Sequence, residues 1–506
     1  MTENTPQKSF TVFEKATLKP ITQIEAASPE LVRSTVSRAR RVRLEWASRP
    51  TLERVAKLPL LRELLTTHAN EIAVLLTREN GKPLHESLLN EVVALIDAID
   101  WLIESAPSIL ASETLSSRWL KHRIHHIERR PLGVTAILSP FNFPLLISGV
   151  DALSAIVTGC PAIIKPSEHC PLSVEYFVKL AHRAGIPEEV LQVLHGGPDI
   201  GQELVTSNID AVRFTGNREN GRNIAIACAQ LGHACTLELG GNCPLLVLED
   251  AEIERLAPAI LFGALSNSGQ TCIGVSRVLV PRVLEPALTA ALVPLIGKLR
   301  QGNPMSGPVE LGALTTILQV ERCHEHVLSA IKTGSKLAVG GSTGESGHFY
   351  LPTLLSGCKF TDKVACEETF GPVIALIPYD NESLAVDALN ADAARLVAYV
   401  FGRESNHLTQ IAKQLDYGQV ITNQVLYTYI CPEIPLGGFK GGGQGTTHGR
   451  EGLLSYSTPK LLGSSRLRLP SMLEFASLDP ARADALAHTF LSSTSAIKKV
   501  SRWFIT

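Results

Sequence analysis

The 506-residue chain has almost no net charge and few aromatic side chains. Its 47 Lys and Arg residues against 49 Asp and Glu residues leave a formal charge of −2, and Phe, Trp and Tyr make up 5% of the residues. This balance disfavours nucleic acid or an anionic membrane as the main partner, because such partners favour clustered Lys and Arg. We therefore expect the partner to be a small molecule.

The sequence also lacks long hydrophobic runs and cysteine motifs. Nowhere do 18 uncharged apolar residues follow one another, and no basic segment precedes an apolar one at the N-terminus, so we expect neither a membrane span nor a signal peptide. The ten cysteines lie between Cys160 and Cys431 without a C-x-x-C spacing, which predicts neither a disulfide framework nor a metal site. These absences favour a soluble, cytoplasmic protein with reduced thiols.

Apolar periodicity predicts an α/β protein of two or three domains. Residues 27–118 have helical spacing, interrupted by the turn sequence Asn80-Gly81-Lys82-Pro83. From Val134, short apolar runs alternate with helices, which indicates βαβ units and buried parallel sheets. The predicted strands are 134–138, 162–164, 190–194, 211–214, 245–248, 278–280, 336–339 and 373–377.

Residues 121–130 form a basic stretch whose alternation predicts an exposed edge strand. Its histidines, His122, His125 and His126, could bind a metal, but a polar edge strand is the favoured interpretation. An unpaired edge is a natural place for another subunit to add. Near the C-terminus, residues 481–491 predict a further helix.

A cysteine and a glutamate, each set among small residues, carry the most informative chemistry. Cys272 ends residues 267–272 (NSGQTC), and Glu238 lies within residues 236–241 (TLELGG). A thiol can attack a carbonyl carbon, and a carboxylate can take a proton from the thiol or from water. These two residues alone allow any thiol acyl-transfer enzyme, including a hydrolase.

No G-x-G-x-x-G occurs in the chain, so the common dinucleotide fingerprint is absent. Residues 211–221 instead predict a strand, a Gly turn and a helix start, where Gly216, Asn217 and Gly221 would let backbone N–H groups face an anion. Lys165 and Glu168 follow another predicted strand and could hold ribose hydroxyls. An ordinary βα turn and a solvated ion pair remain open as alternatives.

Seven ordered segments together resemble the NAD(P)-dependent aldehyde dehydrogenase superfamily over residues 30–465. They are 139–144 (SPFNFP), 165–168 (KPSE), 214–216 (FTG), 238–241 (ELGG), 269–272 (GQTC), 367–373 (EETFGPV) and 435–440 (PLGGFK). The resemblance implies an NAD-binding domain at 1–118 and 136–240, a catalytic domain at 241–435, and an oligomerisation arm at 119–135 and 453–466. Both domains would be Rossmann-like open sheets, residues 467–506 would form an extension of unknown role, and the oligomer would be a homodimer or homotetramer.

The resemblance implies roles for the catalytic residues. Cys272 would be the nucleophile, and Asn142 with the backbone N–H of Cys272 would hold the oxyanion. Hydride loss would leave a thioester, and Glu238 would activate the water that hydrolyses it. A carboxylate among Leu237, Leu239 and two glycines is expected to have a raised pKa, because it is partly desolvated.

The same resemblance implies the cofactor contacts. Glu368 and Phe370 would hold the nicotinamide ribose and ring, and Lys165 and Glu168 the adenosine ribose. Because Glu168 would repel a 2′-phosphate, we expect NAD to be favoured, with NADP possible.

Some positions depart from the family pattern. Phe141 replaces the usual Trp, and Thr446-Thr447 stand where many members have Arg-Glu, so Glu238 would be the only evident base. The C-terminal part is more similar to the class 3 and fatty-aldehyde branch, which implies an aromatic or medium- to long-chain aliphatic aldehyde. The expected pocket residues are Phe141, Phe143, Ile273, Tyr429 and Cys431. The alternatives are a CoA-acylating dehydrogenase, which Glu238 disfavours, and a non-catalytic structural relative.

Overall fold

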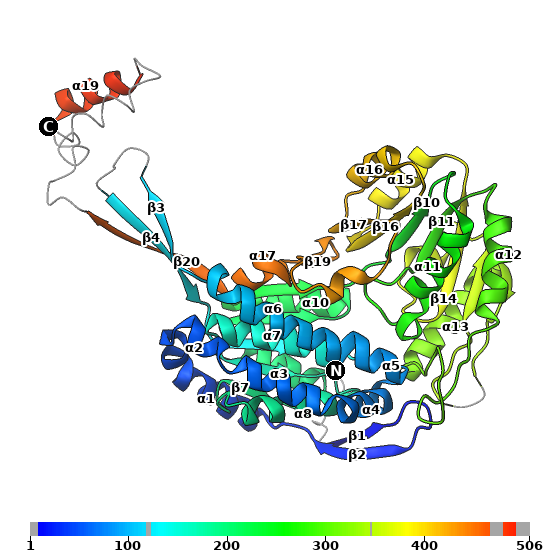
Figure 1. Ribbon diagram of the computed structural model, residues 1–506, viewed down its shortest axis with the longest axis horizontal. Helices are drawn as coiled ribbons and strands as arrows, with labels where there is room; N and C mark the ends of the chain where they lie inside the picture. The colour runs from blue at the N-terminus through cyan, green and yellow to red at the C-terminus, as the bar shows by residue number, and fades with distance from the viewer. Residues whose placement is uncertain (1–8, 118–122, 345–346, 466–478, 492–506) are drawn as a thin grey trace. The chain divides into compact units, whose positions relative to one another are not determined.

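The computed structural model describes residues 9–117, 123–344, 347–465 and 479–491 (Figure 1). Its contacts divide the chain into two compact units, one of residues 1–107 and 132–456 and the other of residues 108–131 and 457–506. Within the described residues, no helix is long and apolar enough to cross a membrane. The same residues contain no group of three or more His, Cys, Asp or Glu side chains that could hold a metal ion.

The first unit opens with a hairpin of β1 (Ser9–Phe13) and β2 (Pro20–Glu25), which the periodicity did not predict. The predicted helical region follows. Its helices are α1 (Pro29–Ser48), α2 (Thr51–Val55), α3 (Leu58–Thr67), α4 (Ala69–Asn80), α5 (Leu84–Ser87), the π-helix η1 (Leu88–Val93) and α6 (Ala94–Ile109). The turn predicted at residues 80–83 ends α4, because Gly81 adopts the left-handed conformation with φ 103°.

A six-stranded sheet in the order β19-β9-β8-β5-β6-β7 forms one half of this unit. Its strands are β5 (Thr135–Leu138), β6 (Ala162–Lys165), β7 (Leu191–Val193), β8 (Ala211–Thr215), β9 (Ala234–Glu238) and β19 (Gly443–Gln444). All neighbours are parallel except β19 and β9. Its helices are α7 (Pro144–Thr158), α8 (Leu172–Arg183), α9 (Pro198–Thr206) and α10 (Arg218–Leu231), of which α7, α8 and α10 are labelled in Figure 1.

A seven-stranded sheet in the order β12-β13-β14-β11-β10-β16-β17 forms the other half, and only β12 and β13 pair antiparallel. Its strands are β10 (Pro244–Val247), β11 (Arg277–Pro281), β12 (Lys336–Val339), β13 (Thr353–Ser356), β14 (Val373–Tyr379), β16 (Val397–Phe401) and β17 (Gln419–Thr422). Its surrounding helices are α11 (Ile253–Leu265), α12 (Glu285–Ile296), α13 (Ile317–Lys332), α14 (Lys363–Cys366), α15 (Glu382–Asn390) and α16 (Ser405–Gln414). Two open, mostly parallel sheets confirm the predicted α/β fold class.

Short elements complete the first unit. They are the 3₁₀ turns η2 (Ser266–Gly269) and η3 (Tyr427–Ile430), the strand pair β15 (Ala394–Arg395) and β18 (Phe439–Lys440), and the helix α17 (Gly449–Leu454). The division into a cofactor domain and a catalytic domain stays a prediction, and the strand β19 of the six-stranded sheet lies outside both expected ranges.

The second unit contains a three-stranded antiparallel sheet in the order β20-β4-β3 and the helix α19 (Pro480–Leu491). The strands are β3 (Glu113–Ser116), β4 (Arg123–Pro131) and β20 (Ser457–Ser465). The expectation that the basic stretch forms an unpaired edge is wrong, because β4 is the central strand and pairs on both sides. Alternation reports the faces of a strand and not its edges. His122 and most of the extension at 467–506 lie outside the described residues.

Candidate active site

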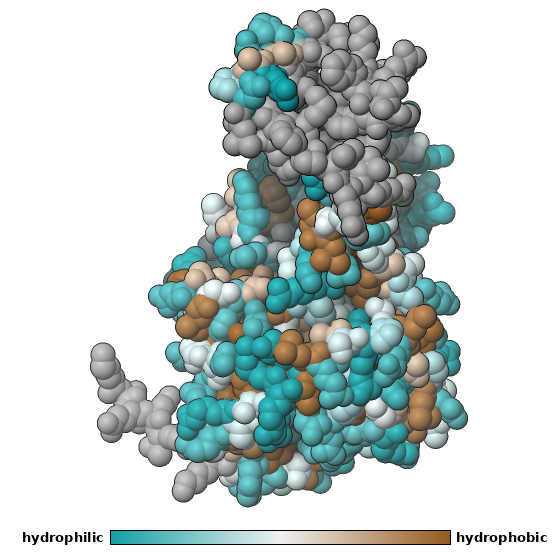
Figure 2. Space-filling model, turned by 90° about the vertical axis from the view of Figure 1, so that its left-hand side faces the viewer, coloured by the Kyte–Doolittle hydropathy of each residue, from teal (hydrophilic) through white to brown (hydrophobic). Residues whose placement is uncertain are grey.

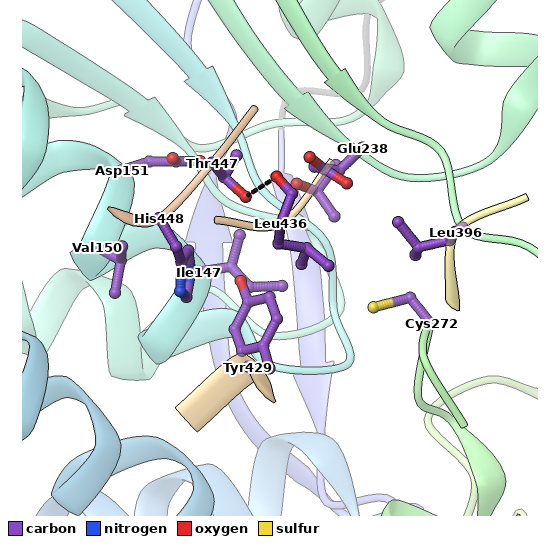
Figure 3. Close-up of a pocket in the computed structure, with 12 residues that line it drawn as sticks. Ile147, Val150, Asp151, Glu238, Cys272, Leu396, Tyr429, Leu436, Thr447 and His448 are labelled. Carbon is purple, nitrogen blue, oxygen red and sulfur yellow. Dashed lines mark hydrogen bonds between the residues drawn. The ribbon is translucent and has the colours of Figure 1, made fainter. Parts of the chain in front are cut away.

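Cys272 lies between two cavities that share Ile147, Cys272 and Tyr429 in their walls. The first, here called the Glu238 cavity, has a volume of about 20 Å³ and is shown in Figure 3. The remaining residues that line it are Val150, Asp151, Thr215, Glu238, Gly240, Leu396, Leu436, Thr447 and His448. The nucleophile and the base predicted from the sequence therefore face one enclosed space.

The second, here called the apolar cavity, has a volume of about 130 Å³. The remaining residues that line it are Asn90, Phe143, Leu146, Phe262, Ser266, Thr271, Ile273, Val425, Leu426, Tyr427 and Ile430. Three of the five expected pocket residues, Phe143, Ile273 and Tyr429, are in its wall. Phe141 and Cys431 are not among the lining residues of either cavity.

A strained turn presents the nucleophile. Asn267 and Ser268 both have φ 52°, and Gly269 has φ 77°, so three consecutive residues adopt left-handed conformations just before Cys272. A Cβ atom at Gly269 would lie 2.1 Å from the carbonyl oxygen of Gly371, so only glycine fits there. Such strain persists only where the surrounding structure holds it, and it is common at functional sites.

The thiol of Cys272 is protonated in these surroundings. Burial and, to a smaller extent, the carboxylates of Glu368 and Glu238 raise its pKa to about 12. Burial also raises the pKa of Cys358 to about 12, although Cys358 lies outside both cavities. The position of Cys272 beside a base therefore distinguishes it, because its pKa does not.

Glu238 ends β9 and is 7% exposed, and neither of its carboxyl oxygens has a hydrogen-bond partner in the described structure. Burial raises the pKa of Glu238 well above its ordinary value, and the charge of Asp151 raises it further, whereas Arg213 and Thr447 lower it. A raised pKa makes the carboxylate a stronger base for a water proton. This desolvated state is the one that its apolar sequence neighbours predicted.

Three residues around Glu238 were not among the predicted site residues. Asp151 accepts a hydrogen bond of 2.9 Å from the Tyr456 hydroxyl, and burial raises its pKa. Thr447 donates to the carbonyl of Leu436 at 3.4 Å, the dashed line in Figure 3. Asp151 did have a sequence signal, because it is the one charged residue in the otherwise uncharged segment of α7.

His448 also lines the Glu238 cavity and packs against Tyr429, with the two rings tilted and their centroids 4.6 Å apart. Burial lowers the pKa of His448 to about 4, so the imidazole is neutral near neutral pH. Its φ of 58° is a strained conformation for a residue other than glycine. His448 was not among the site residues expected from the sequence.

Asn142 lies between β5 and α7 and is 3% exposed. Its Nδ2 donates to the carbonyl oxygen of Gln270 at 3.2 Å, two residues before Cys272. The amide is therefore close to the nucleophile turn, and its second hydrogen is available for another acceptor.

Lys165 and Glu168 lie at and just after the carboxyl end of β6. Lys165 Nζ donates to the carbonyl oxygens of Pro166 at 3.0 Å and Gly196 at 2.7 Å, and lies 3.7 Å from the Glu168 carboxylate. Burial lowers the pKa of Lys165. Ligands of open α/β sheets bind outside the carboxyl ends of the strands, so both residues are well placed for a nucleotide.

The turn between β8 and α10 fits the predicted anion cradle. Asn217 caps α10, and its Oδ1 accepts from the backbone N–H of Asn220 at 2.9 Å. A Cβ atom at Gly221 would lie 2.1 Å from Leu239, and one at Gly216 would lie 2.5 Å from Phe214. Glycines therefore allow close packing at a helix N-terminus, where backbone N–H groups favour a phosphate.

Glu368 and Phe370 follow α14 in the second sheet's half of the unit. The Glu368 carboxylate lies beside Gly240, at 3.3 Å from the place of an added Cβ, and burial raises its pKa to about 8. Phe370 packs edge to face against Phe141, with centroids 5.9 Å apart. Phe141 therefore belongs with the expected nicotinamide residues and not with the apolar cavity.

Comparisons with known proteins show the family of the chain. A sequence profile of the Aldehyde dehydrogenase family matches residues 1–462. The chain is 32% identical over 446 residues to the 4,4'-diapolycopene aldehyde oxidase of Methylomonas sp., covering 88% of this chain and 83% of that protein. It is 34% identical over 420 residues to the glutarate-semialdehyde dehydrogenase of Pseudomonas putida, covering 82% and 86%.

Solved structures give the same result. The NAD⁺ complex of an aldehyde dehydrogenase from Bacillus cereus superimposes with a TM-score of 0.87 at 30% identity, covering 90% of this chain and 93% of that one. An NADP-dependent enzyme of Escherichia coli superimposes with a TM-score of 0.87 at 28% identity, covering 90% and 95%. The chain therefore belongs to the aldehyde dehydrogenase family and is an NAD(P)-dependent enzyme.

Proposed function

We propose that the enzyme oxidises an apolar aldehyde, aromatic or medium- to long-chain aliphatic, to the carboxylic acid. The observation that carries this proposal is the position of Cys272 in the shared wall of an apolar cavity and the Glu238 cavity. The acyl chain would occupy the apolar cavity, and the hydrolytic water would approach from the side of Glu238. The thiol would therefore lie between the acyl chain and the hydrolytic water.

Each step follows from the chemistry of a side chain. The Cys272 thiol loses its proton to solvent, and the thiolate attacks the aldehyde carbon to form a thiohemiacetal. The Asn142 amide and the backbone N–H of Cys272 hold the oxyanion. NAD(P), when bound by Lys165, Glu168, Glu368, Phe370 and the turn at 216–221, supplies the hydride acceptor. Glu238 then removes a proton from the water that attacks the resulting thioester.

The cavity wall supports an apolar substrate. Its described lining includes four aromatic rings and no charged side chain. A semialdehyde with a distal carboxylate would lose its hydration there without gaining a cationic partner, which costs several kcal/mol (~2–7). The semialdehyde relatives therefore do not by themselves decide the substrate of this chain.

Steady-state kinetics with a panel of aldehydes test the substrate class. We expect kcat/KM to rise from propanal to octanal by about fourfold per added CH₂ until the cavity is filled, because each buried CH₂ contributes about 0.8 kcal/mol. Succinate semialdehyde should be a poor substrate. A preference for succinate semialdehyde over octanal would overturn the apolar assignment, and a quaternary ammonium aldehyde tests whether the aromatic rings hold a cation instead.

Replacing the nucleophile tests the covalent mechanism. Cys272→Ala should abolish aldehyde oxidation and keep NAD binding, because the thiol does not contribute to the proposed nucleotide site. Cys358→Ala is a matched control, since burial raises the pKa of both thiols to about 12. Formation of acyl-CoA when CoA is added would instead support the CoA-acylating alternative.

We also propose a preference for NAD, because Glu168 lies beside Lys165 where it would repel a 2′-phosphate. Glu168→Gln should raise kcat/KM for NADP relative to NAD. An unchanged ratio would remove Glu168 as the determinant.

A further inference from the structure

A buried ion pair joins Lys82, in the turn predicted at residues 80–83, to Glu91. Lys82 and Glu91 are both 0% exposed, and the Nζ and Oε1 atoms lie 2.6 Å apart. Burying two charges costs several kcal/mol, and removing one partner of a buried pair destabilises a protein by about 3–5 kcal/mol. A buried ion pair is therefore weak evidence for stability. A positional role is the alternative explanation for such a pair.

The pair fixes the segment that carries Asn142. Lys82 Nζ donates to the carbonyl oxygen of Asn142 at 2.7 Å and lies 4.1 Å above the ring of Phe143. Glu91 Oε2 accepts from the backbone N–H groups of Leu145 at 2.9 Å and Leu146 at 3.0 Å. The chain around Asn142 is therefore held at its carbonyl and at the first turn of α7.

A second carboxylate from the same stretch fixes the nucleophile turn. Glu86 accepts from the backbone N–H of Asn267 at 2.9 Å and 3.0 Å. Asn267 Nδ2 in turn donates to the carbonyl oxygens of Asn142 at 3.0 Å and Gln270 at 3.1 Å. The carbonyl of Asn142 thus receives one donor from Lys82 and one from the turn that leads to Cys272.

The geometry points to Lys82, Glu86 and Glu91 as positioning residues that hold the Asn142 amide in register with the Cys272 sulfur. All three lie within ten residues on α5, η1 and the turn before them, so one short segment supports both halves of the oxyanion site. Glu91 lies in the π-helix η1, a rare geometry that is frequent at functional sites. This inference rests on the proposed thiohemiacetal mechanism.

The double variant Lys82→Met/Glu91→Gln tests this role. It removes both charges together, which is often neutral for stability, and the introduced amide keeps an oxygen that can accept from the α7 N–H groups. We expect an unchanged melting temperature, a KM within about threefold of wild type, and kcat and the single-turnover rate of NADH formation lowered about 10- to 100-fold, as for other small misplacements. A role in stability alone would lower the melting temperature and leave kcat unchanged.

Arg40→Met/Asp210→Asn is the matched control. Arg40 Nη1 lies 3.0 Å from Asp210 Oδ2, which also accepts from the backbone N–H of Val134 at 2.7 Å, so this partly exposed pair makes the same kind of contacts away from both cavities. Its kcat should stay at the wild-type value.

Asn267→Gly is a second variant that does not depend on the folding of the first. Glycine suits the φ of 52° at this position, and the change deletes only the donor to Asn142 and Gln270. It should also lower kcat without changing KM. If the wild type is active and the soluble variants keep its kcat, the positioning role is overturned. If the wild type itself does not oxidise aldehydes, the proposed function is overturned instead.

Discussion

At the residue scale, Glu238 has to act without a second carboxylate at position 447. Its two carboxyl oxygens lack hydrogen-bond partners in the described structure, so they are free to accept a water proton. We expect Glu238→Gln to retain the first burst of NADH and to lower the steady-state rate by about 10²- to 10⁴-fold, because only deacylation needs the water activated. Stopped-flow absorbance separates the two phases.

Glu79→Gln is the control for that variant, since Glu79 is also fully buried with a pKa raised to about 7 and lines neither cavity. It should keep both phases. Loss of the burst in Glu238→Gln would mean that Glu238 acts mainly on the thiol and not on the water.

Asp151 should set the pH dependence of deacylation. Its negative charge raises the pKa of Glu238, so Asp151→Asn should lower that pKa. Because the base works when ionised, the rate rises with pH through the pKa of Glu238, and the acidic limb of kcat should move to lower pH in the variant. An acidic limb that stays in place would assign it to another group, such as Glu368, whose pKa is raised to about 8.

At the element scale, close backbone packing holds the nucleophile turn against the segment after Glu368. Gly269→Ala should destabilise the protein and lower activity, because its Cβ would lie 2.1 Å from the Gly371 oxygen. Gly232→Ala separates the two causes, since Gly232 also has positive φ, 73°, but nothing lies within 4 Å of an added Cβ. Chemical denaturation should show a loss of about 1–2 kcal/mol for Gly232→Ala and a larger loss for Gly269→Ala.

Equal losses for the two glycine variants would mean that the Gly371 backbone moves aside without cost.

The elements themselves were only partly predictable. Some strands with continuous apolar runs, such as β5 and β10, were found from the sequence. The strand β9 was missed because only its last three residues are buried, and β16 was missed although all of its residues are buried. The segment with a polar, alternating pattern was identified as a strand, but its central place in the sheet depends on β3 and β20, which periodicity does not pair.

At the scale of the whole molecule, we expect a homodimer or homotetramer that forms through the sheet of β3, β4 and β20. On β20, Leu461 is 61% exposed and Leu462 is 38% exposed, and among the described strands β20 pairs only with β4. Leu461→Lys/Leu462→Lys should lower the mass measured by light scattering, because charges at a strand edge oppose further pairing. Figure 2 shows one face of the molecule, with exposed apolar groups scattered over it.

Leu44→Lys serves as the control for the oligomer, since Leu44 is 68% exposed on α1 and lies in the other compact unit. Its mass should equal that of wild type. A wild-type chain that is monomeric at all concentrations would refute the expected assembly.

The sequence by itself determined the chemistry of the reacting groups: a thiol and a carboxylate among small residues, and glycines at a helix start. It also determined the α/β class, because buried parallel strands require continuous apolar runs. Only the tertiary structure decided what surrounds those groups. Folding places Glu238 in one cavity with Asp151, Thr447 and His448, and it brings Lys82 to the carbonyl oxygen of Asn142. No local sequence pattern connects these segments. Desolvation, and hence the pKa of Glu238, exists only after that assembly.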